Sequence, residues 1–455
     1  MKEAFGFTRR LIHRDFSGYT GLAVKNSIYS FLTSFVAKIG SLLFTALIIG
    51  SSFLVKLFGL FSIELKPLLS PEMFGLYTLS LSTILIFAGF SDLGIGNALV
   101  RYISKYERNS QGYIYYLAKL KIILTSVVAL ILVASSYFVA SYYDKPIFLA
   151  LLAGSAYIVS VSLIGFVSGF FSAENNFKTI LHRELIFQTL RLIIVPIVLI
   201  YSLVYSTQFV LFFMFLSLSL CYFMALLFLK LNIKKYNGNK LNSSQKKEVN
   251  KFIWPLTVTA LSGTFFGYID IIMLGKFVEA TYIAYYQAAF ALLSAGITII
   301  SFSGVLFPIF SRLKGVRLLN GLKKSIIVTI PLSVLGLIFT YLIANFAVGF
   351  LYNADYLPAV KILQCLSVLF LIDPLIGIYS SYFLSEGKSY FVAKVLIIST
   401  LVNIILNYVL IRALLPYGAY IAVFGAVIAT TLSRIIYLGM FMFNRNTSTN
   451  HISNN

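Results

Sequence analysis

The chain alternates long apolar runs with short segments rich in lysine and arginine, and this pattern restricts its fold more than any other feature. A membrane-spanning helix needs about 20 mostly apolar residues, and runs of that length recur between residues 28 and 443. Charged residues make up 11% of the chain, whereas a soluble domain carries about 25%. The mean hydropathy of +0.90 agrees with this composition. The sequence therefore predicts an all-α polytopic membrane protein.

The apolar runs predict about twelve transmembrane helices. Their expected positions are residues 28–53, 73–98, 117–140, 147–171, 185–205, 208–229, 253–275, 283–308, 325–350, 359–384, 390–412 and 418–443. The segment 51–70 contains Lys56, Glu64 and Pro67, which predict a helix end and an interfacial loop of unassigned role.

The formal net charge of +21 is explained by membrane topology and does not indicate a nucleic-acid partner. Cytoplasmic loops of membrane proteins carry an excess of lysine and arginine. With a cytoplasmic N-terminus, the predicted outer loops carry few of these residues: Lys56, Lys66, Lys145, Lys276, Lys361 and Arg412. The pattern predicts that both termini are cytoplasmic. The basic N-terminus lacks the pattern of a removable signal peptide.

One long polar segment, residues 230–252, divides the chain into two sets of six predicted spans. The expected organisation is a cytoplasmic lead, a first bundle, a basic linker, a second bundle and a polar cytoplasmic tail, at residues 1–25, 26–229, 230–252, 253–443 and 444–455. Similar motifs open the second and eighth spans and close the fourth and tenth, at offsets of roughly 210 residues, which indicates a duplication. Parallel six-helix repeats predict transport by rocking one bundle against the other.

Three basic residues are expected inside spans, where charges are costly and often functional. They are Lys38, Arg191 and Arg434. Each can extend its charged group to the membrane interface, and Arg191 can instead pair with Glu184 on the same helix. Alternatively, the three form a cationic cavity for a pyrophosphate, which arginine binds in a bidentate manner.

Three acids also lie within predicted spans. Asp92 is expected to pair with Arg101 or Lys105 and to fix the turn that follows it. Asp270 is a candidate either for a hydrogen bond between packed helices or for ion coupling. Asp373 precedes Pro374, and the pair is expected to break its helix in mid-membrane. This arrangement suits a site for H⁺ or Na⁺, with pairing to a cavity cation as the alternative.

Enzymatic chemistry is not expected. The two cysteines and three histidines have no metal-ligand spacing, and no catalytic triad or phosphate-binding glycine loop is apparent. A membrane polysaccharide polymerase would need a larger outer loop or paired acids in an inner loop. We therefore predict a protein without cofactor.

Several motifs resemble one family of membrane proteins. They are Pro71–Tyr77 (PEMFGLY), Phe90–Ala98 (FSDLGIGNA) followed by Arg101, Glu174–Lys178 (ENNFK) and Tyr282–Tyr285. Together these motifs resemble polysaccharide-repeat flippases of the Wzx type, and the resemblance covers residues 25–443. The same superfamily holds multidrug and toxic-compound extruders and lipid II flippases. The latter usually have extra C-terminal spans, so a chain with about twelve spans resembles them less.

The resemblance implies a V-shaped fold of two helical lobes, like that of the multidrug extruders. It also implies a flippase that moves an undecaprenyl-pyrophosphate-linked oligosaccharide, such as an O-antigen unit, to the periplasmic leaflet of the bacterial inner membrane. Expected partners are this lipid-linked oligosaccharide, membrane lipids, a polysaccharide polymerase and a chain-length regulator. The alternative is a cation-coupled drug antiporter of the same fold, which a cavity of acids and aromatic residues without net positive charge would favour.

Overall fold

The computed structural model describes residues 18–52, 67–205, 207–231, 233–301 and 303–453, and within these ranges the regular structure is helical. The first half contains α2 (Gly18–Ile49), α4 (Pro71–Asp92), α5 (Ile95–Tyr106), η1 (Glu107–Ser110), α6 (Gln111–Tyr143), α7 (Phe148–Ala173), α8 (Phe177–Tyr205), η2 (Thr207–Phe209) and α9 (Val210–Leu227). The second half contains η3 (Ile233–Lys235), α10 (Ser243–Phe277), α11 (Ala280–Ile300), α12 (Ser303–Phe310), α13 (Gly315–Leu351), η4 (Ala354–Tyr356), α14 (Ala359–Leu366), α15 (Leu369–Ser385), α16 (Ser389–Leu414), η5 (Leu415–Tyr417) and α17 (Ala419–Ser453). We call α2–α9 the N-terminal lobe and α10–α17 the C-terminal lobe.

Local sequence signals set the ends of several helices. Ser70 caps α4, since its hydroxyl accepts a hydrogen bond from the Met73 amide at 3.2 Å, and Pro71 occupies the first turn. At the other end of α4, Leu93 and Gly94 adopt left-handed backbone angles, φ 44° and 79°. These angles end the helix at Asp92, so the predicted span 73–98 was too long.

Two other predicted spans are broken in the structure. The span expected at 283–308 is divided at Ser301, where α11 ends in extended backbone. The span expected at 359–384 consists of α14 and α15, which bend by 44° at their junction. Pro374 does not break α15, contrary to expectation. The break lies between Leu366 and Leu369, one to two turns before the proline.

The membrane-spanning character agrees with the prediction. Among the described residues, ten helical segments are long and apolar enough to cross a bilayer, and α14 with α15 adds an eleventh. One of the ten, Pro71–Tyr143, has 73 residues. A straight helix of that length would extend about 110 Å, far beyond a hydrocarbon core of about 30 Å. It consists of two crossings, α4 and α6, which pack side by side. With this division, the number of crossings equals the predicted twelve.

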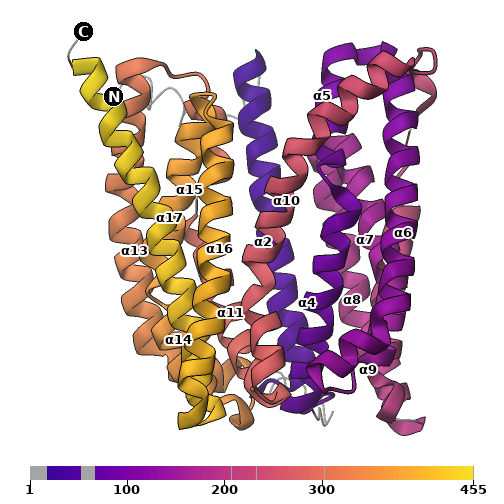
Figure 1. Ribbon diagram of the computed structural model, residues 1–455, viewed down its shortest axis with the longest axis vertical. Coiled ribbons are helices and arrows are strands. Elements are labelled where there is room, and N and C mark those ends of the chain that lie inside the picture. Colours follow the sequence, from indigo (N-terminus) through magenta and orange to yellow (C-terminus); the bar gives the residue numbers. More distant parts are fainter. Residues whose placement is uncertain (1–17, 53–66, 206, 232, 302, 454–455) are drawn as a thin grey trace.

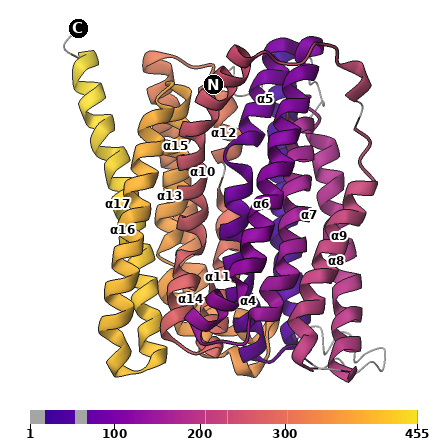
Figure 2. The ribbon, with the colours of Figure 1, turned by 45° about the vertical axis from the view of Figure 1, so that its right-hand side comes forward.

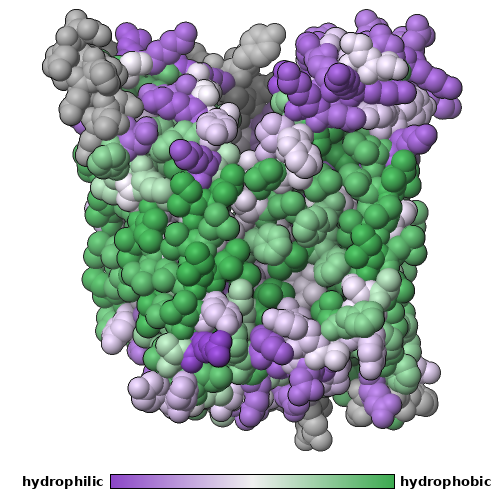
Figure 3. Space-filling view, viewed as in Figure 1, coloured by the Kyte–Doolittle hydropathy of each residue, from purple (hydrophilic) through white to green (hydrophobic). Residues whose placement is uncertain are grey.

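The two lobes lie side by side. Figure 1 shows α6–α9 on one side, α13–α17 on the other, and α2, α4, α10 and α11 between them. The view turned by 45° shows the same long, nearly parallel helices (Figure 2). A broad hydrophobic band lies between more polar ends on the face drawn in Figure 3. Such a band is expected of a protein that is solvated by lipid at mid-height.

The two ends of the molecule are packed differently. At the end where α4 and α11 begin, one hydrophobic core includes residues of both lobes, among them Phe74, Ile283 and Tyr356. At the opposite end the core is divided in two: one cluster, around Tyr102, includes residues of the N-terminal lobe together with Val249 and Ile253 of α10, and the other, around Phe383, lies within the C-terminal lobe. We call these the sealed end and the basic end. The sealed end is the predicted outer end, and the basic end carries the segment 230–252, of which Ser243 onward is the first part of α10.

Candidate functional site

Direct backbone packing closes the sealed end. Gly75 at the start of α4 lies against Ala280 at the start of α11, so closely that an added Cβ would overlap the Ala280 carbonyl. Gly75 belongs to the motif Pro71–Tyr77 and Ala280 to the similar stretch Glu279–Tyr285, the two motifs that indicated a duplication. The motifs therefore meet at the boundary between the lobes, where only glycine permits this approach.

Hydrogen bonds on two sides of this contact join the lobes. On one side the Ser52 amide donates to the Tyr352 carbonyl at 3.2 Å, and the Asn353 side-chain amide donates to the Ile49 carbonyl at 3.1 Å. These bonds link the ends of α2 and α13.

On the other side, two lysines each bind a carbonyl of the opposite lobe. Lys145 Nζ donates to the Gly275 carbonyl at 2.7 Å, and Lys276 Nζ donates to the Tyr142 carbonyl at 2.6 Å. Lys276 also lies over the Tyr142 ring, 4.5 Å from its centroid. Burial lowers the pKa of the Lys145 ammonium. We call this reciprocal pair the lysine latch.

A cavity of about 480 Å³ lies between the lobes. Its walls come from α2 and α4 of the N-terminal lobe and from α10 and α11 of the C-terminal lobe. The charged residues among its lining are Lys38 on α2 and Asp270 on α10, whose formal charges cancel. Two predicted site residues are therefore brought to one cavity from segments more than 200 positions apart in the sequence.

Asp270 is buried at the cavity wall and is held by neutral donors. Its carboxylate accepts hydrogen bonds from the Tyr286 hydroxyl at 2.6 Å, the Thr430 hydroxyl at 2.6 Å and the Asn407 side-chain amide at 2.8 Å. No ion pair within 4.0 Å involves Asp270 in the described part of the chain. Three donors satisfy the carboxylate without neutralising its charge.

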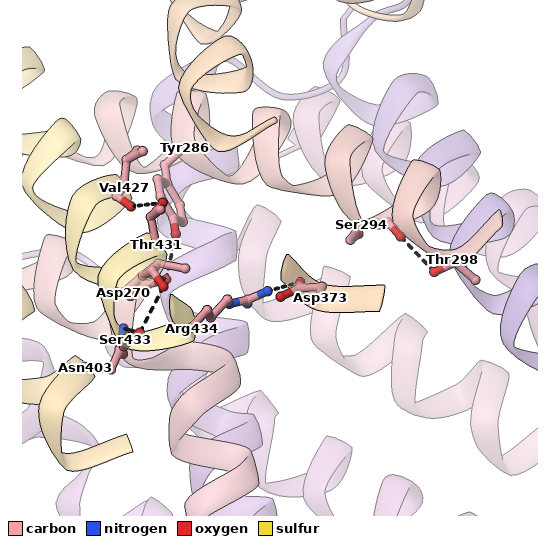
Figure 4. A network of polar contacts seen from close by, with 11 residues as sticks. Asp270, Tyr286, Ser294, Thr298, Asp373, Asn403, Val427, Thr431, Ser433 and Arg434 are labelled. Carbon is pink, nitrogen blue, oxygen red and sulfur yellow. Dashed lines mark hydrogen bonds and ion pairs between the residues drawn. The ribbon is translucent and has the colours of Figure 1, made fainter. Parts of the chain in front are cut away.

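This network ties α10 to three neighbouring helices, α11, α16 and α17, and Figure 4 shows Asp270 and Tyr286 within it. The amide oxygens of Asn403 and Asn407 are buried nearby and have no hydrogen-bond partner among the described residues. Buried polar atoms are nearly always paired, by protein or by water. The cluster therefore offers acceptor oxygens beside a carboxylate that forms no ion pair among the described residues.

Arg434 and Asp373 form an ion pair between α17 and α15, also drawn in Figure 4. The side chains are 12% and 21% exposed, respectively. The guanidinium of Arg434 also faces Phe290, which lines the cavity, with 5.9 Å between the guanidinium carbon and the ring centroid. Two roles were predicted for Asp373, a site for H⁺ or Na⁺ and pairing with a cation. The ion pair with Arg434 is the second of these.

Arg191 lies apart from these groups, inside the N-terminal lobe. It is 9% exposed, and its guanidinium carbon lies 4.5 Å from the centroid of Phe44 and 5.4 Å from that of Phe187. Of the alternatives for Arg191, pairing with Glu184 is wrong, because Glu184 pairs with the adjacent Arg183 at 3.0 Å. The Nε and Nη2 atoms of Arg191 are buried without a hydrogen-bond partner among the described residues.

The partner expected for Asp92 is also wrong. Asp92 pairs with Lys121 of α6 at 2.8 Å, and the Lys121 side chain is only 3% exposed. Lys105 instead pairs with Glu248 at 3.8 Å. The Arg101 guanidinium lies over Phe252, 4.1 Å from its centroid. The left-handed turn after Asp92 redirects α5, so the bases that follow in sequence do not reach back to the acid.

Sequence reasoning missed several residues at the site. Tyr268 and Gln287 line the cavity, while Asn407 and Thr430 hold Asp270. One signal was available, since Asn403 and Asn407 are four residues apart in an apolar run and so share a helix face.

Known structures share this arrangement of helices. An inward-facing multidrug resistance MATE family transporter of the MOP superfamily superposes with a TM-score of 0.63 at 13% sequence identity, covering 92% of this chain and 98% of that chain. The lipid II flippase MurJ in its inward closed conformation gives a TM-score of 0.63 at 18% identity, with 93% and 87% of the two chains covered. A MOP superfamily transporter from Pyrococcus furiosus gives 0.58 at 15% identity, with 93% and 95% covered.

The fold is thus that of the transporters of the MOP superfamily, as the resemblance implied. No curated protein sequence matches the chain. The profile of the polysaccharide biosynthesis protein family matches residues 41–314, which is more than half of the sequence. The chain belongs to the polysaccharide biosynthesis protein family.

Proposed function

We propose that the protein is a flippase for a lipid-linked oligosaccharide. Its substrate would be an undecaprenyl-pyrophosphate-linked repeat unit, such as an O-antigen unit, moved from the cytoplasmic to the periplasmic leaflet of the bacterial inner membrane. The observation that carries this proposal is the cavity between the lobes in a member of a polysaccharide biosynthesis family. A polar headgroup cannot cross the hydrocarbon core unsolvated, and this cavity provides polar groups at mid-membrane.

The proposed mechanism is alternating access. The basic end is taken as cytoplasmic, with both termini on that side, and the headgroup enters the cavity while the sealed end is closed. Lys38 faces the pyrophosphate there, and Arg434 and Arg191 are further cationic candidates. Release requires that the contact of Gly75 with Ala280 and the hydrogen bonds beside it separate. Rocking of two parallel repeats provides such a movement.

Coupling to H⁺ or Na⁺ is proposed at Asp270, whose negative charge has no cationic partner in the described structure. Neutralising this carboxylate would change how α10 packs against its neighbours. The same helix lines the cavity and ends at the lysine latch, so one helix connects the three sites. Asp373, Asp92 and Arg101 remain predicted coupling or gating residues. A polysaccharide polymerase and a chain-length regulator are the proposed partners.

The alternative function is a cation-coupled drug antiporter. One observation favours it, because the formal charges that line the cavity cancel and the remainder of the lining is aromatic, aliphatic or neutral polar. We favour the flippase because the family match concerns polysaccharide biosynthesis.

Surface polysaccharide in a deletion strain distinguishes the two functions. Wild type should restore the polymer, and Lys38→Met should lower it about tenfold or more, because a charge-assisted hydrogen bond contributes about 1.5–3 kcal/mol. Lys119→Met is the matched control, since Lys119 is exposed on α6 and does not line the cavity. Protein levels are compared by blot. Polymer that survives the deletion, together with altered sensitivity to cationic drugs, would contradict the flippase proposal.

A further inference from the structure

The α10 wall of the cavity contains two glycines that helix packing does not require. Gly263 and Gly267 lie four residues apart, on one face of the helix. A Cβ added at Gly267 would meet no atom within 4 Å, and one at Gly263 would only touch Leu396 at 3.9 Å. Gly75 and Gly275 differ, because an added Cβ there would overlap the opposite lobe. Gly263 and Gly267 therefore leave space for something other than protein.

Neutral hydrogen-bonding groups surround this space. Tyr268 of α10 and Gln287 of α11 line the cavity beside these glycines, and Ser41 lines it from α2. A carboxamide offers both donors and acceptors, and a hydroxyl offers both from one atom. The Phe290 ring, also in the lining, adds an apolar face. The lining cation, Lys38, is on α2 in the other lobe.

We propose that the α10 wall binds the saccharide part of the substrate, with Gly263 and Gly267 setting the size of sugar that fits, while the pyrophosphate lies toward Lys38. This inference rests on the proposed flippase function and adds the orientation of the headgroup. A sugar has no net charge, and its hydroxyls both donate and accept hydrogen bonds, which matches Tyr268 of α10 and Gln287 of the neighbouring α11. Its apolar C–H face suits an aromatic ring. The volume of about 480 Å³ is within the range of ligand pockets, about 300–1,000 Å³.

A matched pair of glycine substitutions tests the size limit. Gly267→Leu fills the proposed sugar space, whereas Gly439→Leu on α17 also meets no atom within 4 Å but lies outside the cavity. Both changes raise helix propensity. In the complemented deletion strain, Gly267→Leu is expected to lower the polymer at least about tenfold, a usual effect of misplaced methylene groups in a binding site. Gly439→Leu should leave it unchanged. Equal polymer from both variants at equal protein levels overturns the proposal.

A protection experiment tests the orientation without requiring transport. Gly267→Cys is made in a background with Cys221→Ala and Cys365→Ser, and the purified protein in detergent is labelled with a maleimide. The probes are bare undecaprenyl pyrophosphate and the glycosylated lipid extracted from the deletion strain. Glycosylated lipid should slow labelling severalfold, and the bare lipid should not. Equal protection by both probes, or protection by neither, overturns the saccharide assignment.

These outcomes separate the two proposals. If wild type fails to restore any polymer to the deletion strain, the flippase function itself is wrong. If wild type restores the polymer but the glycosylated lipid leaves the labelling of the Gly267→Cys variant unchanged, the flippase function stands and the saccharide wall is wrong.

Discussion

Each lobe contains a largely buried arginine, and the two arginines differ in their partners. In the C-terminal lobe, Arg434 pairs with Asp373 of a neighbouring helix. In the N-terminal lobe, Arg191 is enclosed by aromatic rings and has no acidic partner in the described structure, with two of its nitrogens left without hydrogen bonds. A buried charge is costly unless it is paired. The C-terminal lobe thus pairs its arginine with an acid, while the arginine of the N-terminal lobe has aromatic neighbours instead.

We propose that this difference reflects separate functions of the two lobes. The C-terminal lobe carries the two acids that lie well inside their helices, Asp270 and Asp373. Asp270 accepts hydrogen bonds from neutral side chains, and Asp373 forms an ion pair with Arg434. Such carboxylates suit ion coupling, in which an acid binds and releases H⁺ or Na⁺ while the lobe stays folded. Both Lys38, which lines the cavity, and Arg191, which is buried between aromatic rings and does not line it, belong to the N-terminal lobe.

Removing the partner of Arg434 should have the largest effect on stability. Asp373→Leu makes the C-terminal lobe resemble the N-terminal one, with a buried arginine unpaired. We expect the free energy of unfolding in detergent to fall by about 3–5 kcal/mol, the usual loss when one member of a buried pair is removed. The double variant Asp373→Leu, Arg434→Leu should recover most of this loss. Losses that simply add in the double variant would contradict the pairing.

Neutralising the second acid should have an intermediate effect. Asp270→Asn keeps the shape of the side chain but cannot satisfy the donors of Tyr286, Thr430 and Asn407 together. A buried donor left without a partner costs about 1–3 kcal/mol, so we expect a loss of about 2 kcal/mol in the same unfolding assay. Transport should also lose its dependence on the H⁺ or Na⁺ gradient. If the dependence on both gradients persists, Asp270 is not the coupling site.

Weakening the contact between the lobes should lower the free energy of unfolding less than the two acid substitutions do. It should, however, increase the population in which the sealed end is open. Lys145→Met with Lys276→Met removes both bonds of the lysine latch. A shift of about 1.4 kcal/mol changes a population about tenfold, and we expect labelling of Gly267→Cys from the sealed end to accelerate by roughly that factor. Lys361→Met is the control, because Lys361 is exposed on α14 and forms no part of the latch. An unchanged labelling rate would show that the latch does not hold the lobes together.

Replacing Arg191 should change the free energy of unfolding least. The result can be compared directly with the loss expected when Arg434 is left unpaired. Arg191→Met loses ring contacts worth about 0.5–2 kcal/mol but also removes an unpaired buried charge. The unfolding free energy should therefore stay within about 1 kcal/mol of wild type. A loss as large as that of Asp373→Leu would reveal an acidic or anionic partner for Arg191.

The sequence predicted the helical fold and the residues at its polar centres, but it did not predict which residues pair. Apolar run length identified the crossings, and isolated charges within them identified Asp270, Asp373 and Arg434. The partner of Asp92 is Lys121, 29 positions away on an antiparallel helix. Two of the three donors to Asp270 lie 137 and 160 positions away, on α16 and α17. Such pairings depend on how helices pack, which the local pattern of a single sequence does not contain.

The most direct test of the central claim is transfer of the glycosylated lipid between leaflets. The purified protein would be reconstituted in liposomes that contain undecaprenyl-pyrophosphate-linked oligosaccharide, and the fraction of sugar accessible to external periodate would be followed in time. We predict that wild type exposes the inner-leaflet lipid and that Lys38→Met slows this transfer about tenfold, because the pyrophosphate loses a charge-assisted bond. If wild-type liposomes match protein-free liposomes under both H⁺ and Na⁺ gradients, the flippase account is contradicted.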